Sequence, residues 1–307
     1  MAIANLCVVI ILALKNTPFA LLSPWSYERL NILHQVAGCM TIIFIILHAS
    51  LYTANFTSQG RPERLLETEE IYGMVAGLSF LFVGFAGMVV RRWWYELFYY
   101  LHITFWMLGL VMVGMHQPEL SKKVVYVVGV IGGIWVLDRV VRLARLAVYG
   151  TNNSVVLTPL SNGATRITMA KTPFGARPGK HCFVWIPRIR PTETHPFTIV
   201  STSPLEFVVN SYDGFTASLY SFAKANPGAR LQASLDGPYG TMPTAGKFEK
   251  VILIAGGSGI TFTLGVAVDL LQSAASNATK EVTFVWIVKE KGMLTHPRGF
   301  SDHSCSG

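Results

Sequence analysis

The chain has 307 residues, of which 51% are apolar, and it carries a net charge of +8. Its mean hydropathy of +0.43 is too high for an ordinary soluble protein, and the apolar excess lies before residue 150. The positive charges are scattered, which argues against a nucleic-acid binder and fits a membrane protein with basic edges. The four cysteines, Cys7, Cys39, Cys182 and Cys305, form neither a disulfide framework nor a CxxC metal site.

Apolar segments within residues 1–149 predict an α-helical transmembrane bundle of about five helices. Residues 1–24 begin with an apolar run that we interpret as a membrane helix, because it lacks the basic start and the cleavage site of a signal peptide. A helix needs ~20 residues to cross a bilayer. Further spans of about this length are expected at residues 31–53, 71–90, 97–116 and 123–143.

Two of these spans each carry two histidines, and the spacing is fourteen residues in both. The first holds His34 and His48, and the second holds His102 and His116. Fourteen steps of about 100° return to within roughly 40° of the starting face and advance about 21 Å along the helix. Two such helices side by side would present two levels with one histidine from each helix. This predicts two stacked haems with bis-histidine ligation.

A histidine in an apolar helix need not be a metal ligand. A lone one is more often a hydrogen-bonded core residue. Four ionisable residues inside spans, paired twice at one spacing, favour a functional role instead. Structural zinc is less favoured than haem, because it needs four close ligands, often including cysteine.

Basic residues between the spans predict the orientation. On one side lie Arg61, Arg64, Lys122 and Lys123. The other side carries the larger set and is expected to be cytoplasmic. That set is Lys15, Arg29, Arg91, Arg92, Arg139, Arg142 and Arg145. The loop at 55–70, with a glycosylation sequon at Asn55, then faces outward. His34 belongs to the inner level and His48 to the outer level, and the second half of the chain is cytoplasmic.

Residues 150–245 predict an antiparallel β-barrel. Short runs rich in β-branched and aromatic residues alternate there with Gly, Pro and Asn, which is typical of several short strands. One helix interrupts them at 216–226. The expected strands are 154–160, 164–170, 181–187, 197–203, 206–212 and 229–235.

Two short motifs in this region suit a flavin nucleotide. The first, HPFT at 195–198, offers an aromatic ring, a hydroxyl and a polar ring that can stack on a flavin and bond its ribityl or phosphate groups. The second, Gly214-Phe215-Thr216, opens the helix, where free N–H groups and the helix dipole suit a pyrophosphate. Taken singly, each motif is also compatible with an ordinary strand or helix start.

Residues 246–289 predict the first βαβ half of a dinucleotide-binding α/β domain. A strand, a glycine turn and a helix are followed by a second buried strand, EVTFVWIVK. Gly256, Gly257 and Gly259 let the backbone approach a phosphate, and Thr261 is expected to cap the helix. The turn lacks a strict GxGxxG, so a purely structural tight turn stays an alternative.

Together these features resemble the fungal ferric-chelate reductase family of the flavocytochrome b superfamily, whose relatives include the NADPH oxidases. The resemblance spans about residues 5–289 and depends on the order and spacing of its motifs. These are ALKNTPF, SYERLNILH, the two histidine pairs, PGKH, HPFT, GFT, GPYG and GGSGIT. It implies a membrane haem core, a cytosolic FAD-binding barrel of the ferredoxin reductase type and a partial NADPH-binding domain.

Carried over by position, the resemblance assigns residues to three kinds of cofactor: two haems b, FAD and NADPH. The haem ligands would be His34, His48, His102 and His116. The FAD residues would be His195, Pro196, Phe197, Thr198, Gly214 and Thr216. The NADPH loop would be Gly256, Gly257, Ser258, Gly259, Ile260 and Thr261.

The resemblance further implies an oxidoreductase of the plasma membrane. It would move electrons from cytosolic NADPH through FAD and the haems to extracellular ferric or cupric chelates, for iron uptake. Bis-histidine ligation leaves no open iron position, so outer-sphere electron transfer is expected. Three alternatives stay open: a superoxide-generating NADPH oxidase-like enzyme, an inactive haem- and FAD-binding fragment, and a membrane transporter or scaffold, which the flavin motifs argue against.

The C-terminus departs from the family pattern. Family members continue through more strands to a cysteine-glycine motif and an aromatic residue near the end. Residues 290–307 show no helix or strand period, and Cys305 is followed by Ser306. We interpret this tail as truncated and expect the chain to take up haem and FAD but to show little or no NADPH-driven turnover.

Overall fold

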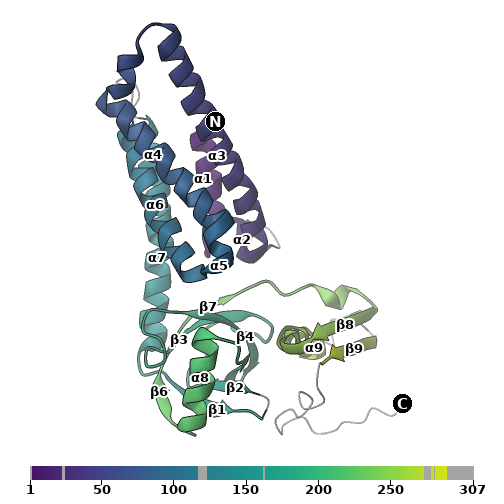
Figure 1. Ribbon diagram of the computed structural model, residues 1–307. Coiled ribbons are helices and arrows are strands. Elements are labelled where there is room, and N and C mark those ends of the chain that lie inside the picture. Colours follow the sequence, from purple (N-terminus) through teal and green to yellow (C-terminus); the bar gives the residue numbers. More distant parts are fainter. Residues whose placement is uncertain are drawn as a thin grey trace. The chain divides into compact units, whose positions relative to one another are not determined.

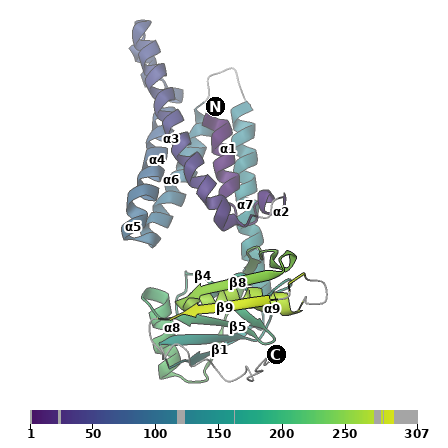
Figure 2. The same ribbon diagram turned by 90° about the vertical axis from the view of Figure 1, so that its right-hand side faces the viewer.

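The computed structural model describes residues 2–22, 25–116, 123–161, 163–272, 278–279 and 281–288. Its contacts divide the chain into two compact units, Met1–Val141 and Arg142–Gly307. Figures 1 and 2 show helices in the first unit, and strands with further helices in the second. The tail at 290–307 lies outside the described residues, so the expectation of a truncated end stays a prediction.

The described secondary structure of the first unit is helical. A helix satisfies every backbone N–H and C=O within its own segment, which is what long apolar segments require in lipid. The elements are α1 (Ala2–Ala13), α2 (Pro18–Leu22), α3 (Tyr27–Ser58), η1 (Pro62–Leu66), α4 (Thr68–Phe85), the π-helical η2 (Ala86–Val90), α5 (Arg91–Trp93), α6 (Tyr95–Met115) and α7 (Lys123–Gly150), whose last turns belong to the second unit.

The expected membrane bundle is confirmed. Among the described residues, four helical segments are long and apolar enough to cross a bilayer: Tyr27–Ser58, Thr68–Trp93, Tyr95–Met115 and Lys123–Gly150. They cover the four spans that the sequence predicts after the first apolar run. In that first run, α1 has 12 residues, fewer than the ~20 of a full span. A fifth crossing therefore stays a prediction.

The helices of this unit pack through a small core. α1 lies along α3, and α4 lies along α6. The buried cluster that joins α1, α4, α6 and α7 comprises Leu6, Ile10, Phe80, Trp106, Leu110 and Ile131. Many other large apolar side chains are exposed, and Leu51 on α3 has 67% of its surface free. Such exposure is no liability in a bilayer, because lipid tails are as apolar as leucine.

The second unit contains a seven-stranded antiparallel sheet. Its strands are β1 (Ser154–Pro159), β2 (Ala164–Met169), β3 (His181–Trp185), β4 (His195–Thr202), β5 (Leu205–Asn210), β6 (Arg230–Gln232) and β7 (Ser234–Tyr239), and their order in the sheet is β6-β1-β2-β5-β4-β3-β7. All six neighbouring pairs are antiparallel. The expected antiparallel β domain is thus present as a curled sheet.

The two edges of this sheet belong to neighbouring strands in the sequence. β6 pairs with β1 at one edge, β7 pairs with β3 at the other, and the buried Ala233 alone separates β6 from β7. The run at 229–235, predicted as one strand, is therefore two strands with different partners. The prediction was wrong because a period-two pattern shows which residues point inward but not where a strand changes partner.

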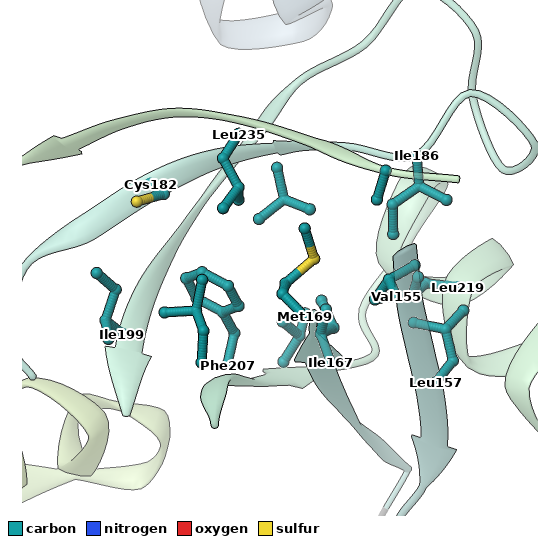
Figure 3. Packing of buried hydrophobic residues seen from close by; sticks show 14 of the residues in the cluster. Val155, Leu157, Ile167, Met169, Cys182, Ile186, Ile199, Phe207, Leu219 and Leu235 are labelled. Carbon is teal, nitrogen blue, oxygen red and sulfur yellow. The ribbon is translucent and has the colours of Figure 1, made fainter. Parts of the chain in front are cut away.

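The concave side of the sheet encloses a dense core (Figure 3). Alternate residues of each strand point inward, as the period of a strand requires. Val155, Leu157, Ile167, Ile199 and Phe207 are all at most 1% exposed. α8 (Gly214–Ala225) packs against β1 and β2. It buries residues four apart, one face of a helix, namely Phe215, Leu219 and Ala223.

A strand–helix–strand segment follows. β8 (Lys250–Gly256), the 3-10 turn η4 (Gly257–Gly259), α9 (Ile260–Gln272) and β9 (Glu281–Ile287) succeed one another along the chain. β8 and β9 are parallel and side by side (Figure 2). A small core of Leu253, Val266 and Leu270 joins α9 to β8. The expected βαβ half of an α/β domain is thus present.

Candidate functional site

The four histidines of the bundle meet in two pairs. His34 on α3 faces His102 on α6, with ring centroids 6.3 Å apart and an interplanar angle of 62°. His48 on α3 faces His116, which directly follows α6, at 6.2 Å and 76°. Each level therefore holds one histidine from α3 and one from α6 or its C-cap.

Both ring separations suit a metal ion between the imidazoles. Metal–nitrogen bonds of about 2.0 Å, extended by one ring radius on each side, place the centroids of two opposed imidazoles roughly 6 Å apart. The observed separations of 6.3 and 6.2 Å match this value.

Backbone carbonyls fix the tautomer of one histidine at each level. Nδ1 of His34 lies 2.8 Å from the carbonyl oxygen of Val9 on α1, and Nδ1 of His116 lies 2.7 Å from that of Glu69 on α4. A carbonyl oxygen can only accept, so Nδ1 carries the proton and Nε2 keeps its lone pair for a metal. Gly73 permits this approach, because a Cβ there would lie 2.6 Å from Nδ1 of His116.

The donors at each level fit haem better than zinc. Among the described residues, no group of three or more His, Cys, Asp or Glu side chains could hold a metal ion. Two imidazoles leave four positions of a six-coordinate ion, which a porphyrin fills with its own nitrogens. Space exists one turn after His34: at Gly38, no atom of the described chain lies within 4 Å of where a Cβ would be.

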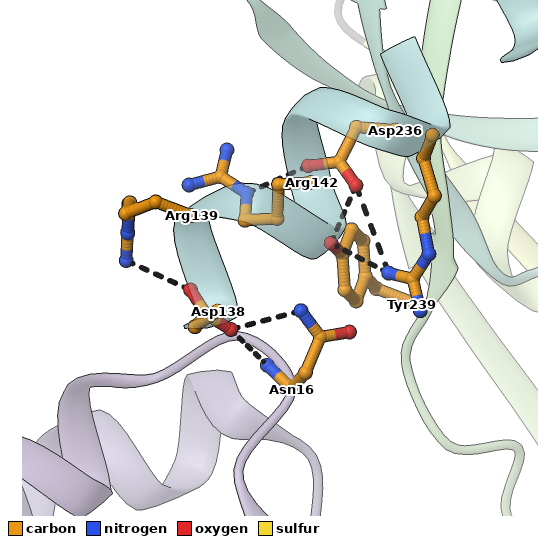
Figure 4. A network of polar contacts seen from close by, with 7 residues as sticks. Asn16, Asp138, Arg139, Arg142, Asp236 and Tyr239 are labelled. Carbon is orange, nitrogen blue, oxygen red and sulfur yellow. Dashed lines mark hydrogen bonds and ion pairs between the residues drawn. The ribbon is translucent and has the colours of Figure 1, made fainter. Parts of the chain in front are cut away.

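A buried carboxylate in the same unit ties the α1–α2 connection to α7 (Figure 4). Asp138 on α7 is 5% exposed, and its Oδ1 accepts hydrogen bonds from the backbone and side-chain nitrogens of Asn16 at 3.0 and 2.8 Å. Arg139 pairs with Oδ2 at 3.1 Å. An ionised carboxylate in a membrane helix needs such partners, so a structural role accounts for this cluster.

In the second unit, rings from the two flavin motifs form a stack. His195 and Phe197 lie two residues apart on β4, so they leave the same face of the strand. Phe215 enters from the first turn of α8. The His195 ring stacks on Phe215 with centroids 4.2 Å apart and planes at 21°, and Phe197 lies 6.2 Å from Phe215. The fold therefore brings the HPFT and GFT segments together.

The other two residues of the HPFT motif leave the opposite face of β4. Pro196 is exposed and Thr198 is partly buried. A ligand on one face of the strand meets His195 and Phe197, whereas a ligand on the other meets Pro196 and Thr198. Nε2 of His195 lies 3.0 Å from a carboxylate oxygen of Glu193, which orients the imidazole from the loop before the strand.

The start of α8 is open and shaped by Thr216. Its Oγ1 accepts a hydrogen bond from the N–H of Tyr212 and donates one to the carbonyl of Asp213, both at 3.0 Å. Thr216 thus holds the loop. Gly214 has φ +47° and, within the described chain, no atom within 4 Å of a Cβ position. The positive end of the 12-residue α8 lies there, which suits an anion.

A buried ion pair precedes the GPYG motif (Figure 4). Asp236 is fully buried, and its carboxylate accepts hydrogen bonds from Nε of Arg142 at 2.8 Å and from the hydroxyl of Tyr239 at 2.6 Å. Arg145 donates to the same hydroxyl at 3.0 Å. Burial and the hydrogen bond to Asp236 raise the pKa of Tyr239 above its usual range. The cluster fixes the last turns of α7 to β7 within the second unit.

The glycine loop connects β8 to α9 as expected. Gly257 has φ +50°, a conformation that glycine adopts at no steric cost, and the following Ser258 is exposed. The capping role expected for Thr261 is wrong. Its Oγ1 donates to the Ser258 carbonyl at 3.0 Å, because the residue lies inside α9 rather than at the N-cap.

Two contributors to these sites are not evident from the sequence. Phe215 belongs to the GFT motif, but its contact with His195 appears only when β4 and α8 pack together. The sequence does mark Phe215 in one way, because it is an aromatic residue directly after the glycine that begins the helix. Gly73 has no local signal, because its close approach to His116 depends on the packing of α4 against α6.

Family models match three successive parts of the chain. Residues 1–113 match the ferric reductase like transmembrane component, residues 150–243 match an FAD-binding domain, and residues 248–299 match the ferric reductase NAD binding domain. Among solved structures, the ferredoxin reductase in carbazole 1,9a-dioxygenase covers 46% of this chain and 43% of its own, with a TM-score of 0.37 and 20% identity.

Curated fungal proteins match nearly the whole chain. Ferric reductase transmembrane component 4 of Saccharomyces cerevisiae is 28% identical over 96% of this chain and 42% of its own length. Ferric/cupric reductase transmembrane component 2 of Schizosaccharomyces pombe is 27% identical over 92% of this chain and 58% of its own length. The chain thus spans about half the length of these relatives. The three domain models, in this order, and the fungal relatives show that the chain is similar to ferric reductases over most of its length.

Proposed function

We propose that the chain acts as a transmembrane ferric or cupric reductase of the plasma membrane, used for iron uptake. Bound haems, FAD and NADPH would supply the chemistry, a transfer of electrons from the cytosol to a metal chelate outside. The observation that carries the proposal is the pair of histidine levels with ring separations of 6.3 and 6.2 Å. The printed names of the fungal relatives support a ferric or cupric acceptor.

In this proposal, histidines of the bundle would bind the haem iron and leave no coordination position for a substrate. His34 and His102 would hold the haem of the inner level, and His48 and His116 would hold that of the outer level. Haem held by two imidazoles would supply electron transfer to an acceptor that does not bind the iron. The carbonyls of Val9 and Glu69 keep one imidazole at each level turned with Nε2 toward the metal.

The second unit's residues would bind the nucleotides. His195 and Phe197, backed by the buried Phe215, would offer aromatic rings to a flavin, and the open start of α8 at Gly214 would receive its pyrophosphate. The loop 256–261 would receive the NADPH pyrophosphate at the start of α9. The flavin assignment depends on the contact between the two flavin motifs.

The test uses purified chain in detergent under anaerobic conditions. Two low-spin haems per chain should appear in the dithionite-reduced minus oxidised spectrum. Ferric citrate, added after excess dithionite is removed, should reoxidise both. A superoxide-generating oxidase would instead be reoxidised by oxygen with superoxide formation and react poorly with ferric citrate. A preparation with neither haem nor flavin would refute the proposal. NADPH-driven reduction, measured in parallel, tests whether this chain shows the low turnover expected from its sequence.

A further inference from the structure

Trp286 reaches the glycine loop from the neighbouring strand. β8 and β9 are parallel, with Ala255 opposite Trp286, so their carboxyl ends meet at one edge. Ligands of open α/β sheets bind at this edge. Nε1 of Trp286 donates a hydrogen bond to the carbonyl oxygen of Gly257 at 2.9 Å. Trp286 is partly buried, while Val285 and Ile287 on either side of it are exposed.

The backbone carbonyls of two successive loop residues, Gly257 and Ser258, both accept hydrogen bonds from the protein. The carbonyl of Gly257 accepts from Trp286 and from the N–H of Ile260. The carbonyl of Ser258 accepts from the same N–H and from the hydroxyl of Thr261 at 3.0 Å. Of these donors, only the indole comes from outside the loop and α9. It is therefore the contact that ties the loop's conformation to β9.

The direction of these carbonyls sets the direction of the next two N–H groups. A trans peptide unit points its C=O and N–H to opposite sides. With the Gly257 carbonyl turned toward Trp286, the N–H of Ser258 points away from β9, and the Gly259 N–H is turned outward in the same way. Ser258 and Gly259 are exposed. At Gly257 and Gly259, no atom of the described chain lies within 4 Å of a Cβ position.

We propose that Trp286 is a positioning residue for the nucleotide: its indole N–H holds the glycine loop so that the Ser258 and Gly259 N–H groups face a pyrophosphate. This inference rests on the proposed function, which supplies NADPH as the ligand. Trp286 itself touches the loop and not the phosphate. Its loss should weaken nucleotide binding and leave the haem and flavin sites unchanged.

The test is Trp286→Phe, which keeps an aromatic ring and removes the N–H donor. Trp185→Phe is the matched control, because the indole of Trp185 on β3 also donates to a loop carbonyl, that of Pro191, at 2.8 Å. Affinity for NADPH is measured by isothermal titration on the full chain in detergent. Trp286→Phe should raise Kd by about threefold to tenfold, the effect of one lost hydrogen bond. Trp185→Phe should leave Kd unchanged.

Three readouts make the outcome decisive. Haem spectra and flavin content should equal those of the wild type in both variants, which shows that the helical bundle and the antiparallel sheet of Trp286→Phe have folded. Gly257→Ala, which strains the same loop at φ +50°, should raise Kd in the same direction. An equal Kd for wild type and Trp286→Phe overturns the inference and leaves the proposed function intact. A wild-type chain that takes up haem and FAD but binds no NADPH overturns the inference and the nucleotide part of the proposed function.

Discussion

The two units of this protein are stabilised by different kinds of interaction. The first leaves side chains such as Leu51 largely exposed and relies on a few directed polar bonds, including those from His34 to Val9 and from Asn16 to Asp138. The second encloses side chains such as Val155 and Phe207 completely. In lipid, helix packing brings no hydrophobic gain, whereas in water the burial of apolar side chains is the dominant stabilising term.

The difference determines where function can be recognised in each unit. In a spanning helix, the face of a side chain follows from its number, so two histidines fourteen residues apart mark two levels. In the curled sheet, His195 meets Phe215 only because β4 and α8 pack together through the core. Substitutions of the histidines in the first unit should therefore act locally, whereas substitutions in the buried core of the second unit should act through stability.

The largest effect should come from His102→Ala. The inner level would lose one of its two imidazoles, and a single remaining ligand cannot give a low-spin bis-histidine centre. We expect loss of one haem of two per chain and at least about a hundredfold slower electron transfer across the bundle, consistent with loss of metal ligation. Haem content and the reduced spectrum measure this.

His181→Ala is the control for that substitution, because His181 lies on β3 in the second unit. It should retain full haem content. His48→Ala should likewise remove one haem, the outer one, and leave the inner level spectrally intact. Two unchanged low-spin haems in His102→Ala would disprove the ligand assignment.

Next in size is Asp236→Asn, which tests the core of the second unit. The fully buried carboxylate pairs with Arg142 and accepts from Tyr239. Its neutralisation leaves a guanidinium without its counter-charge, which costs about 3–5 kcal/mol in buried pairs. The free energy of unfolding of this unit, from urea titration followed by flavin fluorescence, should fall by that order.

A second ion pair in the same unit provides the comparison. Lys250 and Glu281 approach to 2.7 Å, but their side chains are 77% and 55% exposed. Glu281→Gln should change the free energy of unfolding by less than about 1 kcal/mol. If Asp236→Asn and Glu281→Gln lowered the free energy of unfolding equally, burial would not determine how much an ion pair stabilises this unit.

A smaller effect should distinguish the two faces of β4. His195→Ala removes a ring from the stack with Phe215 and should raise the Kd for FAD by about tenfold, the weight of one aromatic contact. Thr198→Ala acts on the opposite face and should weaken FAD less. Fluorescence titration of the apo form with FAD measures both, and a larger effect of Thr198→Ala would place the flavin on the other face.

The smallest effect concerns Cys182 in the sheet's core. Burial, and to a lesser degree the charge of Asp236, raise the pKa of its thiol from 9.0 to about 12. The unfolded chain therefore loses this proton first as pH rises, so the free energy of unfolding declines between about pH 9 and pH 12. Urea titrations at pH 8 and pH 10 should show a shallower decline in Cys182→Ala, and identical slopes would contradict the assignment.

The sequence predicts much of the fold because its signals are local. The spans, the short strands and the strand–glycine–helix segment all follow from periodicity and turn residues. The division of 229–235 into two strands does not, because the change of partner at Ala233 depends on β1 and β3, which lie far away in the sequence. Thr261 was misassigned because the exact first residue of α9 decides between capping the helix and bonding within it.

For the sites, the sequence identifies ligands more readily than the groups that orient them. His34 and His116 stand out as ionisable residues in apolar surroundings. The carbonyls of Val9 and Glu69 that hold them carry no side-chain signature at all. The Trp286 indole resembles any strand aromatic until β9 is paired with β8.

The hydrogen bond from His34 to Val9 also bears on biosynthesis. Val9 precedes His34 in the chain, and His102 lies in the second membrane-length segment after the one that carries His34, so this level is assembled from parts made early and late. A nascent chain that has not yet produced α6 offers each α3 histidine no opposing imidazole, whatever the haem supply. Under the proposed function, haem uptake would therefore require that α3 and α6 have already packed side by side.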